Sequence, residues 1–238
     1  GFTFSVTNFF LKLNDTGGAV AETFDFDGDE DTTEDVVTIA FDGDILALGG
    51  TVDLGIAFGG FETTLSGSFL FEQHADKVLV GIKDAAFTLA IDPVALEISE
   101  VTGLFALYDD GTIAMQLSIG QVALTGIDGF TFEVTDFFLK LNDTGEAVTE
   151  TFDFDGDEDT TEDVVTIAFA DDIIALGGTV DFGLEIGSVT ISISGSFTFE
   201  QSKVINDDDT ESDIIKVSIT DGSMTLGVVD RSEEHTSE

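Results

Sequence analysis

Hydrophobic and polar residues alternate along most of the chain. The clearest run is Val189–Glu200, in which Val, Ile and Phe at odd-numbered positions are separated by Ser, Thr and Glu. A period of two is typical of a strand with one buried face and one solvent face. No segment keeps a helical period over several turns. The pattern therefore predicts an all-β fold with about eight strands in each sequence repeat.

Several of these runs change phase midway. Phe130, Phe132 and Val134 are followed by Phe137, Leu139 and Leu141, so the apolar residues move from even to odd positions. Such a change predicts a β-bulge or a sharp bend inside one long strand. Asp-Gly pairs such as Asp42-Gly43 favour tight antiparallel turns between strands. We therefore expect an antiparallel meander of long bent strands, with most Phe side chains in its core.

The first part of the chain is repeated. Residues 1–73 realign without a gap on residues 129–201, and FFLKLNDTG and TFDFDGDEDTTEDVVTIAF recur unchanged. We interpret residues 1–128 as a complete repeat and 129–230 as a second, truncated copy. Equal sequences predict equal structures, stacked into an elongated sandwich- or solenoid-like body.

Both ends of the sequence look unnatural. The segment Arg231–Glu238 resembles a translated sequencing adapter, and we interpret it as a non-native tail without packing contacts. The chain opens at Gly1 with neither Met nor a signal peptide, so we expect it to be an internal piece of a longer protein.

The charge balance excludes some classes of function. With 49 Asp and Glu against 7 Lys and Arg, the formal net charge is −42. A nucleic-acid binder needs a basic face, and a strongly acidic chain is repelled by anionic lipid. No apolar run approaches the ~18 residues of a membrane span. The chain also lacks cysteine. The acidic bias fits adaptation to saline water, cation binding, or both.

Carboxylates concentrate in one loop of each copy. Asp25–Asp35 holds seven acids in eleven residues, and Asp153–Asp163 has the same sequence. Clustered oxygen ligands suit Ca²⁺, whereas Glu30 and Val36 break the EF-hand pattern. A solvated acidic loop without a specific ion is the alternative. The predicted Ca²⁺ ligands are Asp25, Asp27, Asp29, Asp31 and Asp35, with Asp153, Asp155, Asp157, Asp159 and Asp163.

Candidate catalytic residues are few. His74 is the only histidine ahead of the tail, and the second copy has Ser202 near the matching place, so no Ser-His-Asp set recurs. The acids lie in loop tips, and Trp is absent from any cleft that could hold a sugar. We therefore predict that the chain is not an enzyme.

The segments FFLKLNDTGEAV, ALGGTVDF, SISGSFTFEQ and VTGLFALYDDGTIAMQLS resemble tandem modules of very large secreted bacterial repeat proteins. These proteins occur mainly in aquatic bacteria, often beside calcium-binding repeats. The resemblance implies an extended all-β, adhesin-like architecture at the cell surface or outside the cell, in which neighbouring repeats are the partners. It carries over no catalytic residue. An accessory module of a secreted Ca²⁺-dependent carbohydrate-active or other enzyme is the alternative, as is a salt-adapted module without an ion site.

Overall fold

The computed structural model is all-β and describes residues 1–26, 36–154, 164–205 and 211–228. All regular structure in these ranges is strand, which confirms the predicted fold class. The first repeat contains β1 (Phe2–Asn14), β2 (Val20–Asp25), β3 (Val36–Phe41), β4 (Ile45–Phe58), β5 (Phe61–Gln73), β6 (Lys77–Ile91), β7 (Val94–Tyr108) and β8 (Ile113–Thr125). The second contains β9 (Phe130–Asn142), β10 (Val148–Asp153), β11 (Val164–Phe169), β12 (Ile173–Ile186), β13 (Val189–Ile205) and β14 (Glu211–Val228).

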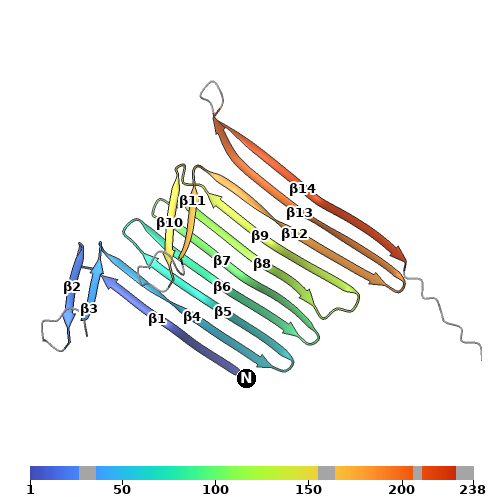
Figure 1. Ribbon diagram of the computed structural model, residues 1–238, viewed down its shortest axis with the longest axis horizontal. Helices are drawn as coiled ribbons and strands as arrows, with labels where there is room; N and C mark the ends of the chain where they lie inside the picture. Colours follow the sequence, from blue (N-terminus) through green and yellow to red (C-terminus); the bar gives the residue numbers. More distant parts are fainter. Residues whose placement is uncertain (27–35, 155–163, 206–210, 229–238) are drawn as a thin grey trace, which may run out of the picture.

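Ten strands form one open antiparallel sheet in the order β1-β4-β5-β6-β7-β8-β9-β12-β13-β14 (Figure 1). Apart from two hairpins that form sheets of their own, strands that follow each other in the sequence are neighbours in the sheet, as the predicted meander requires. The strands β2 and β3, which lie between β1 and β4 in the sequence, form a separate hairpin. The strands β10 and β11 form an equivalent hairpin between β9 and β12 in the sequence. The bounds of β9–β12 are those of β1–β4 displaced by 128 residues, so these four strands recur in the second copy.

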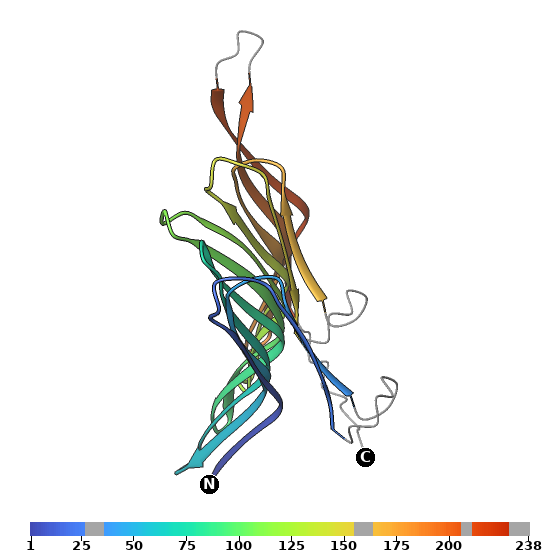
Figure 2. The same cartoon turned by 90° about the vertical axis from the view of Figure 1, so that its left-hand side faces the viewer.

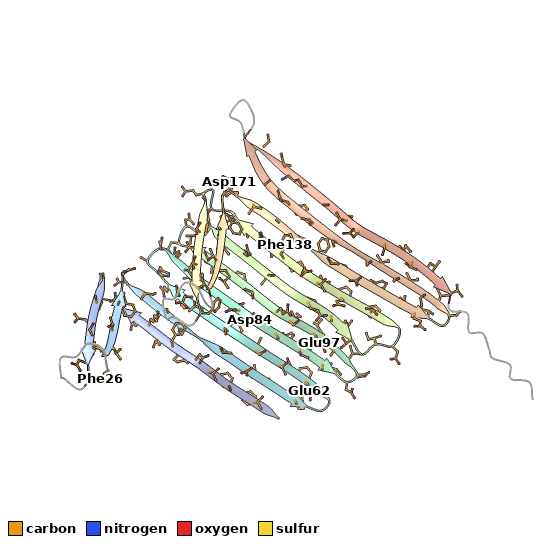
Figure 3. The ribbon with its side chains drawn as sticks, in the orientation of Figure 1. Phe26, Glu62, Asp84, Glu97, Phe138 and Asp171 are labelled. Carbon is orange, nitrogen blue, oxygen red and sulfur yellow. The ribbon has the colours of Figure 1, made fainter. Side chains whose placement is uncertain are left out.

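The changes of phase in the sequence become β-bulges near the middle of the long strands. In β6, the register with β7 shifts on both sides of Ala85, next to Asp84. Asp84 has a positive φ of 50° and lies in the middle of the sheet (Figure 3). Among the described residues, positive φ at a non-glycine position also occurs at Asn8, Glu100, Asp136 and Asp221, each on a different strand. The predicted bulges are confirmed.

A glycine faces the bulge of β6. Gly67 of β5 has a φ of 137°, and a Cβ built on it would lie 2.6 Å from Cα of Ala85. An L side chain fits neither that conformation nor that space. In the second copy, Gly195 lies where the pairing of β13 with β14 shifts register. The bend of the sheet therefore depends on a bulge on one strand and a glycine on the next.

A second layer covers part of the sheet. Both hairpins stand off the same face of the ten-stranded sheet (Figure 2), and β10–β11 lies over strands of the first copy (Figure 1). The main hydrophobic core forms between this hairpin and the sheet. Its buried members are Leu70, Leu79, Leu104, Ala106 and Ala114 from the sheet, with Val148, Phe152, Phe154, Ile167 and Phe169 from the second copy.

The architecture differs in one respect from a stack of sandwiches. The two copies lie side by side in a single sheet, and among the described residues the core cluster lies under β10–β11. The expectation that Phe side chains lie mostly in the core is wrong for most of β1 and for β2–β3, although Phe10 of β1 packs against the core cluster. Phe2, Phe4 and Phe9 are exposed because β1 is the edge strand of the sheet. Alternation shows which face is apolar, but not whether anything covers it.

Candidate functional site

The acidic loops that predict a Ca²⁺ site connect the two strands of each hairpin. Asp25 ends β2 opposite Val36, and Asp153 ends β10 opposite Val164. The other eight predicted ligands, Asp27, Asp29, Asp31, Asp35, Asp155, Asp157, Asp159 and Asp163, lie outside the described residues. Within the described ranges, no group of three or more Asp, Glu or His could hold a metal ion. The Ca²⁺ site therefore stays a prediction.

A buried asparagine fixes the base of each hairpin. In the second copy, the Asn142 side-chain amide donates to the carbonyl oxygens of Glu146 (2.9 Å) and Asp171 (3.0 Å). The Oδ1 atom of Asn142 accepts from the backbone N–H and the hydroxyl of Thr144. One side chain thus joins the chain that enters the hairpin to the chain that leaves it. A buried, fully bonded amide is costly to replace, so it defines the direction in which the hairpin projects.

The first copy repeats this arrangement atom for atom. The amide of Asn14 donates to the carbonyl oxygens of Gly18 (2.8 Å) and Gly43 (2.7 Å), and Thr16 donates to Asn14 Oδ1. The backbone N–H of Gly17 donates to Asp44, as that of Gly145 does to Asp172. The recurrent Asn-Asp-Thr-Gly sequence is therefore the structural base of the hairpin, and it aims both hairpins in the same direction relative to their own strands.

Because of that direction, the hairpin of the second copy packs on the sheet of the first copy. Phe152 and Phe154 lie over Gly81 of β6, where an added Cβ would stand 3.0 Å from the first ring and 2.7 Å from the second. The two rings are 6.4 Å apart between centroids. Below, we call Leu70, Leu79, Gly81, Leu104, Ala106 and Ala114 the platform. Its small residues leave room for the two aromatic rings.

Polar side chains close the edge of this contact. Lys77, at the start of β6, donates to both carboxylate oxygens of Glu150 on β10, at 2.7 and 2.9 Å. The Tyr108 hydroxyl, at the end of β7, donates to Glu150 Oε1 at 3.0 Å. Burial raises the pKa of Tyr108 to about 12, with the bond to Glu150 and the negative charges of Glu150 and Asp76 adding to it. Three residues from two copies therefore form one ion-pair cluster.

The strand junction between the copies is equally continuous. β8 pairs with β9 through Ala114↔Asn142 to Leu124↔Phe132. At the end of this pair, the Ile113 backbone N–H donates to the Asp143 carboxylate, and the Asp143 N–H donates to the Ile113 carbonyl oxygen. The junction is therefore defined by strand pairing, by the hairpin and by an aspartate cap.

In the part of the chain that the structure describes, the hairpin of the first copy packs on no comparable surface. Phe24, Phe26 and Ile39 are 53%, 74% and 39% exposed. Their counterparts Phe152, Phe154 and Ile167 are 1%, 6% and 0% exposed. Phe26 lies at the end of β2–β3, clear of the main sheet (Figure 3). Glu22, which corresponds to the partly buried Glu150, is exposed as well, whereas Asp15 and its counterpart Asp143 are both exposed.

His74, the residue weighed for catalysis, follows the end of β5. Its Nε2 lies 3.1 Å from the Glu72 carboxylate, and both side chains are partly buried. A hollow beside it is lined by residues that include Lys12, Asp42, Asp44 and His74. The second copy has no histidine in the corresponding place, so this pair is not part of the repeated architecture.

Sequence reasoning did not identify the residues that join the copies. Asn142, Glu150, Lys77 and Tyr108 are not among the residues that the sequence predicts for a site. The sequence does contain one sign of these contacts. Asn, Asp and Glu at these places are identical in both copies, although neighbouring positions such as Ala21 and Thr149 differ. Lys77 and Tyr108 cannot be identified from the sequence in this way. They lie 73 and 42 residues before Glu150, and no local pattern links residues so far apart.

Comparisons with family models, with curated proteins and with solved structures give no match. In the part of the chain that the structure describes, no helix is long and apolar enough to cross a membrane.

Proposed function

We propose that the chain is a structural repeat segment of a large extracellular or cell-surface bacterial protein, with an adhesin-like role in spacing and display and no catalytic activity. Successive repeats extend one continuous sheet, and each hairpin fastens its own repeat to the previous one. Ca²⁺ bound by the Asp25–Asp35 and Asp153–Asp163 loops stabilises the hairpins in this proposal.

The observation that carries the proposal is the burial of Phe152 and Ile167, residues of the second copy, against Leu79 and Leu104 of the first. Repeats that merely follow each other on a flexible linker would each have a core of their own. Here the core lies across the junction, so pulling or tilting one repeat must disturb its neighbour. Such coupling suits a stiff spacer.

The charge distribution supports a place in salt water outside the cell. An excess of 49 acids over 7 basic residues keeps a sheet with many apolar side chains soluble. The apolar contact between the platform and the hairpin holds neighbouring repeats together, whereas the acidic surfaces of the repeats repel one another. Screening by salt or binding of Ca²⁺ weakens that repulsion without affecting the apolar contact.

The test of this role is the place where the protein is found. Antibodies raised against the full chain should label intact bacterial cells that carry the gene, and mild protease treatment of those cells should remove the label. Labelling that requires permeabilised cells would contradict the proposal. Antibodies against a cytoplasmic protein, applied to the same cells, serve as the control for cell integrity.

A further inference from the structure

Two surfaces of the first copy are exposed although the same sequence is covered in the second copy. The first is the outer edge of β1, which differs from β9 only at Ser5 and Asn8. In β1 the apolar residues Phe4, Phe9 and Leu11 are exposed, whereas their counterparts on β9 lie against β8. A long apolar edge strand is a template for pairing with another strand.

The second surface is the inner face of the hairpin β2–β3. Its strands differ from β10–β11 at one position, Ala21. Phe24, Val37 and Ile39 are exposed there, while Phe152 and Ile167 are fully buried on the platform. Both surfaces lie on the same side of the first copy, because Asn14 aims the hairpin as Asn142 does.

We infer that the β1 edge and the inner face of β2–β3 together form a docking surface for another repeat unit that ends in a β8-type strand and has a free platform. The structure holds an occupied copy of this interface at the junction of β8 with β9, and that copy supplies the register. Displacing the β8–β9 pairs by 128 residues gives Met115↔Leu13, Leu117↔Leu11, Ile119↔Phe9, Val122↔Val6 and Leu124↔Phe4.

The polar contacts of the inferred interface are obtained by the same displacement of 128 residues. Asp15 would accept the backbone N–H at the start of the incoming strand, as Asp143 accepts that of Ile113. Glu22 would receive a lysine and a tyrosine equivalent to Lys77 and Tyr108, as Glu150 does. Main-chain pairing at an edge supplies affinity, and the side-chain contacts select the partner and its register.

A second copy of this chain is not the partner that fits. Its β14 corresponds to β6, because Gln201 pairs with Ile215 as Gln73 pairs with Val78. That register puts Lys216 and Ser218 in place of Leu79 and Gly81. On β13, Thr198 stands in place of Leu70. The platform that the chain does possess is already covered by β10–β11. The inference rests on the proposed function in one point only, namely that repeats are the units that assemble.

The edge is tested with the full chain and a synthetic peptide of residues 113–125 that carries Leu117→Cys and a lysine tag. Because the chain contains no cysteine, Leu11→Cys provides a single thiol on the β1 edge. With oxidised glutathione as the oxidant, we expect a disulfide to form at least about tenfold faster with Leu11→Cys than with Phe4→Cys, which lies too far along the strand in the inferred register. Val217→Cys on the other sheet edge, β14, should react as slowly as Phe4→Cys.

Equal rates for the Leu11 and Phe4 variants, or faster reaction with the Val217 variant, would overturn the inferred register and edge. Concentration-dependent self-association of the chain without peptide binding would overturn it too, in favour of a second copy as the partner. Neither result bears on where in the cell the protein resides, so failure here is distinct from failure of the proposed function.

The hairpin is tested by placing a second copy of residues 61–128 directly before Gly1 of the full chain, which reproduces the Asp128–Gly129 junction. With Tyr108→Phe in the original copy, the added tyrosine is the only one present. Its phenol should titrate above the ordinary pKa of 10 and move toward that value when Glu22→Gln is introduced. A phenol that titrates near 10 with either residue at position 22 would overturn docking on β2–β3.

Discussion

The hairpins β2–β3 and β10–β11 share almost the whole of their strand sequence but differ in the burial of their inner faces. Phe152 and Ile167 are sealed on the platform, whereas Phe24 and Ile39 are exposed. Local sequence, backbone pairing and the asparagine at the base are the same in both. The difference lies in the presence of a platform on the preceding strands. A hydrophobic face therefore specifies a partner surface, and the neighbouring repeat supplies it.

The comparison turns each pair of equivalent residues into a matched experiment. A substitution in β10–β11 measures the contact between copies, and the same substitution in β2–β3 measures the hairpin alone.

The largest effect concerns the aromatic contact. Phe152→Ala removes a fully buried ring from the core and should lower the free energy of unfolding by about 3–5 kcal/mol. Phe24→Ala removes an exposed ring and should change it by less than about 0.5 kcal/mol. Urea unfolding followed by far-ultraviolet circular dichroism measures both. Equal losses would show that the two hairpins do not differ in packing.

Ca²⁺ should stabilise the chain if the acidic loops bind it. At ~100 times Kd, each site that matters for global unfolding adds about 2.7 kcal/mol. Because the loop sequences are identical, calorimetric titration should find two sites, whereas the melting temperature should respond mainly to the loop of the docked hairpin. Asp155→Asn should therefore remove more of the thermal shift than Asp27→Asn.

The control for this prediction is NaCl at matched ionic strength, since screening also relieves repulsion among carboxylates. A shift that NaCl reproduces would identify the loops as solvated acid without a specific ion site. Loss of both calorimetric sites in Asp27→Asn alone would also contradict the equivalence of the two loops.

A smaller effect is expected from the ion-pair cluster. Glu150→Gln keeps the shape of the side chain but leaves the partly buried Lys77 without its counter-ion, at a cost of about 1–3 kcal/mol. Glu22→Gln alters an exposed carboxylate and should stay within about 0.5 kcal/mol of the unmodified chain. Thermal unfolding of the two variants gives the comparison, and a larger effect at Glu22 would contradict it.

Most of the fold follows from the sequence, and the candidate site follows only in part. Alternation around Val189–Glu200 predicts strands, and the shift from Val134 to Phe137 predicts a bulge, because both are properties of a single strand. The contact of Glu150 with Lys77 and Tyr108 depends on where a hairpin projects, and that direction depends on Asn142 and its two backbone partners. No periodicity encodes this direction. The acidic runs that begin at Asp25 and Asp153 are visible in the sequence. Ion binding depends on the geometry of their side chains, which the sequence does not reveal.

The subtlest effect is the response to alkaline pH, and the chain provides its own probe. Tyr108 is the single tyrosine and Trp is absent, so the ultraviolet absorbance of phenolate reports this residue alone. Below pH 10 the phenol is protonated in both the folded and the unfolded state and contributes no pH dependence. Between pH 10 and about 12 the unfolded state loses the proton while the folded state retains it. Stability should therefore fall as pH rises through this window, since the folded state binds more protons.

Comparison with Tyr108→Phe isolates that loss from the titration of lysines in the same pH range. Glu150→Gln should lower the phenol pKa but keep it above 10, because burial is the largest cause of the shift and the hydrogen bond comes second. Glu22→Gln should leave the titration unchanged, since that carboxylate lies on the hairpin that does not reach Tyr108. A midpoint near 10 in the unmodified chain would mean that β10–β11 does not cover the end of β7 in solution. The two hairpins would then be alike in their exposure as well as in their sequence.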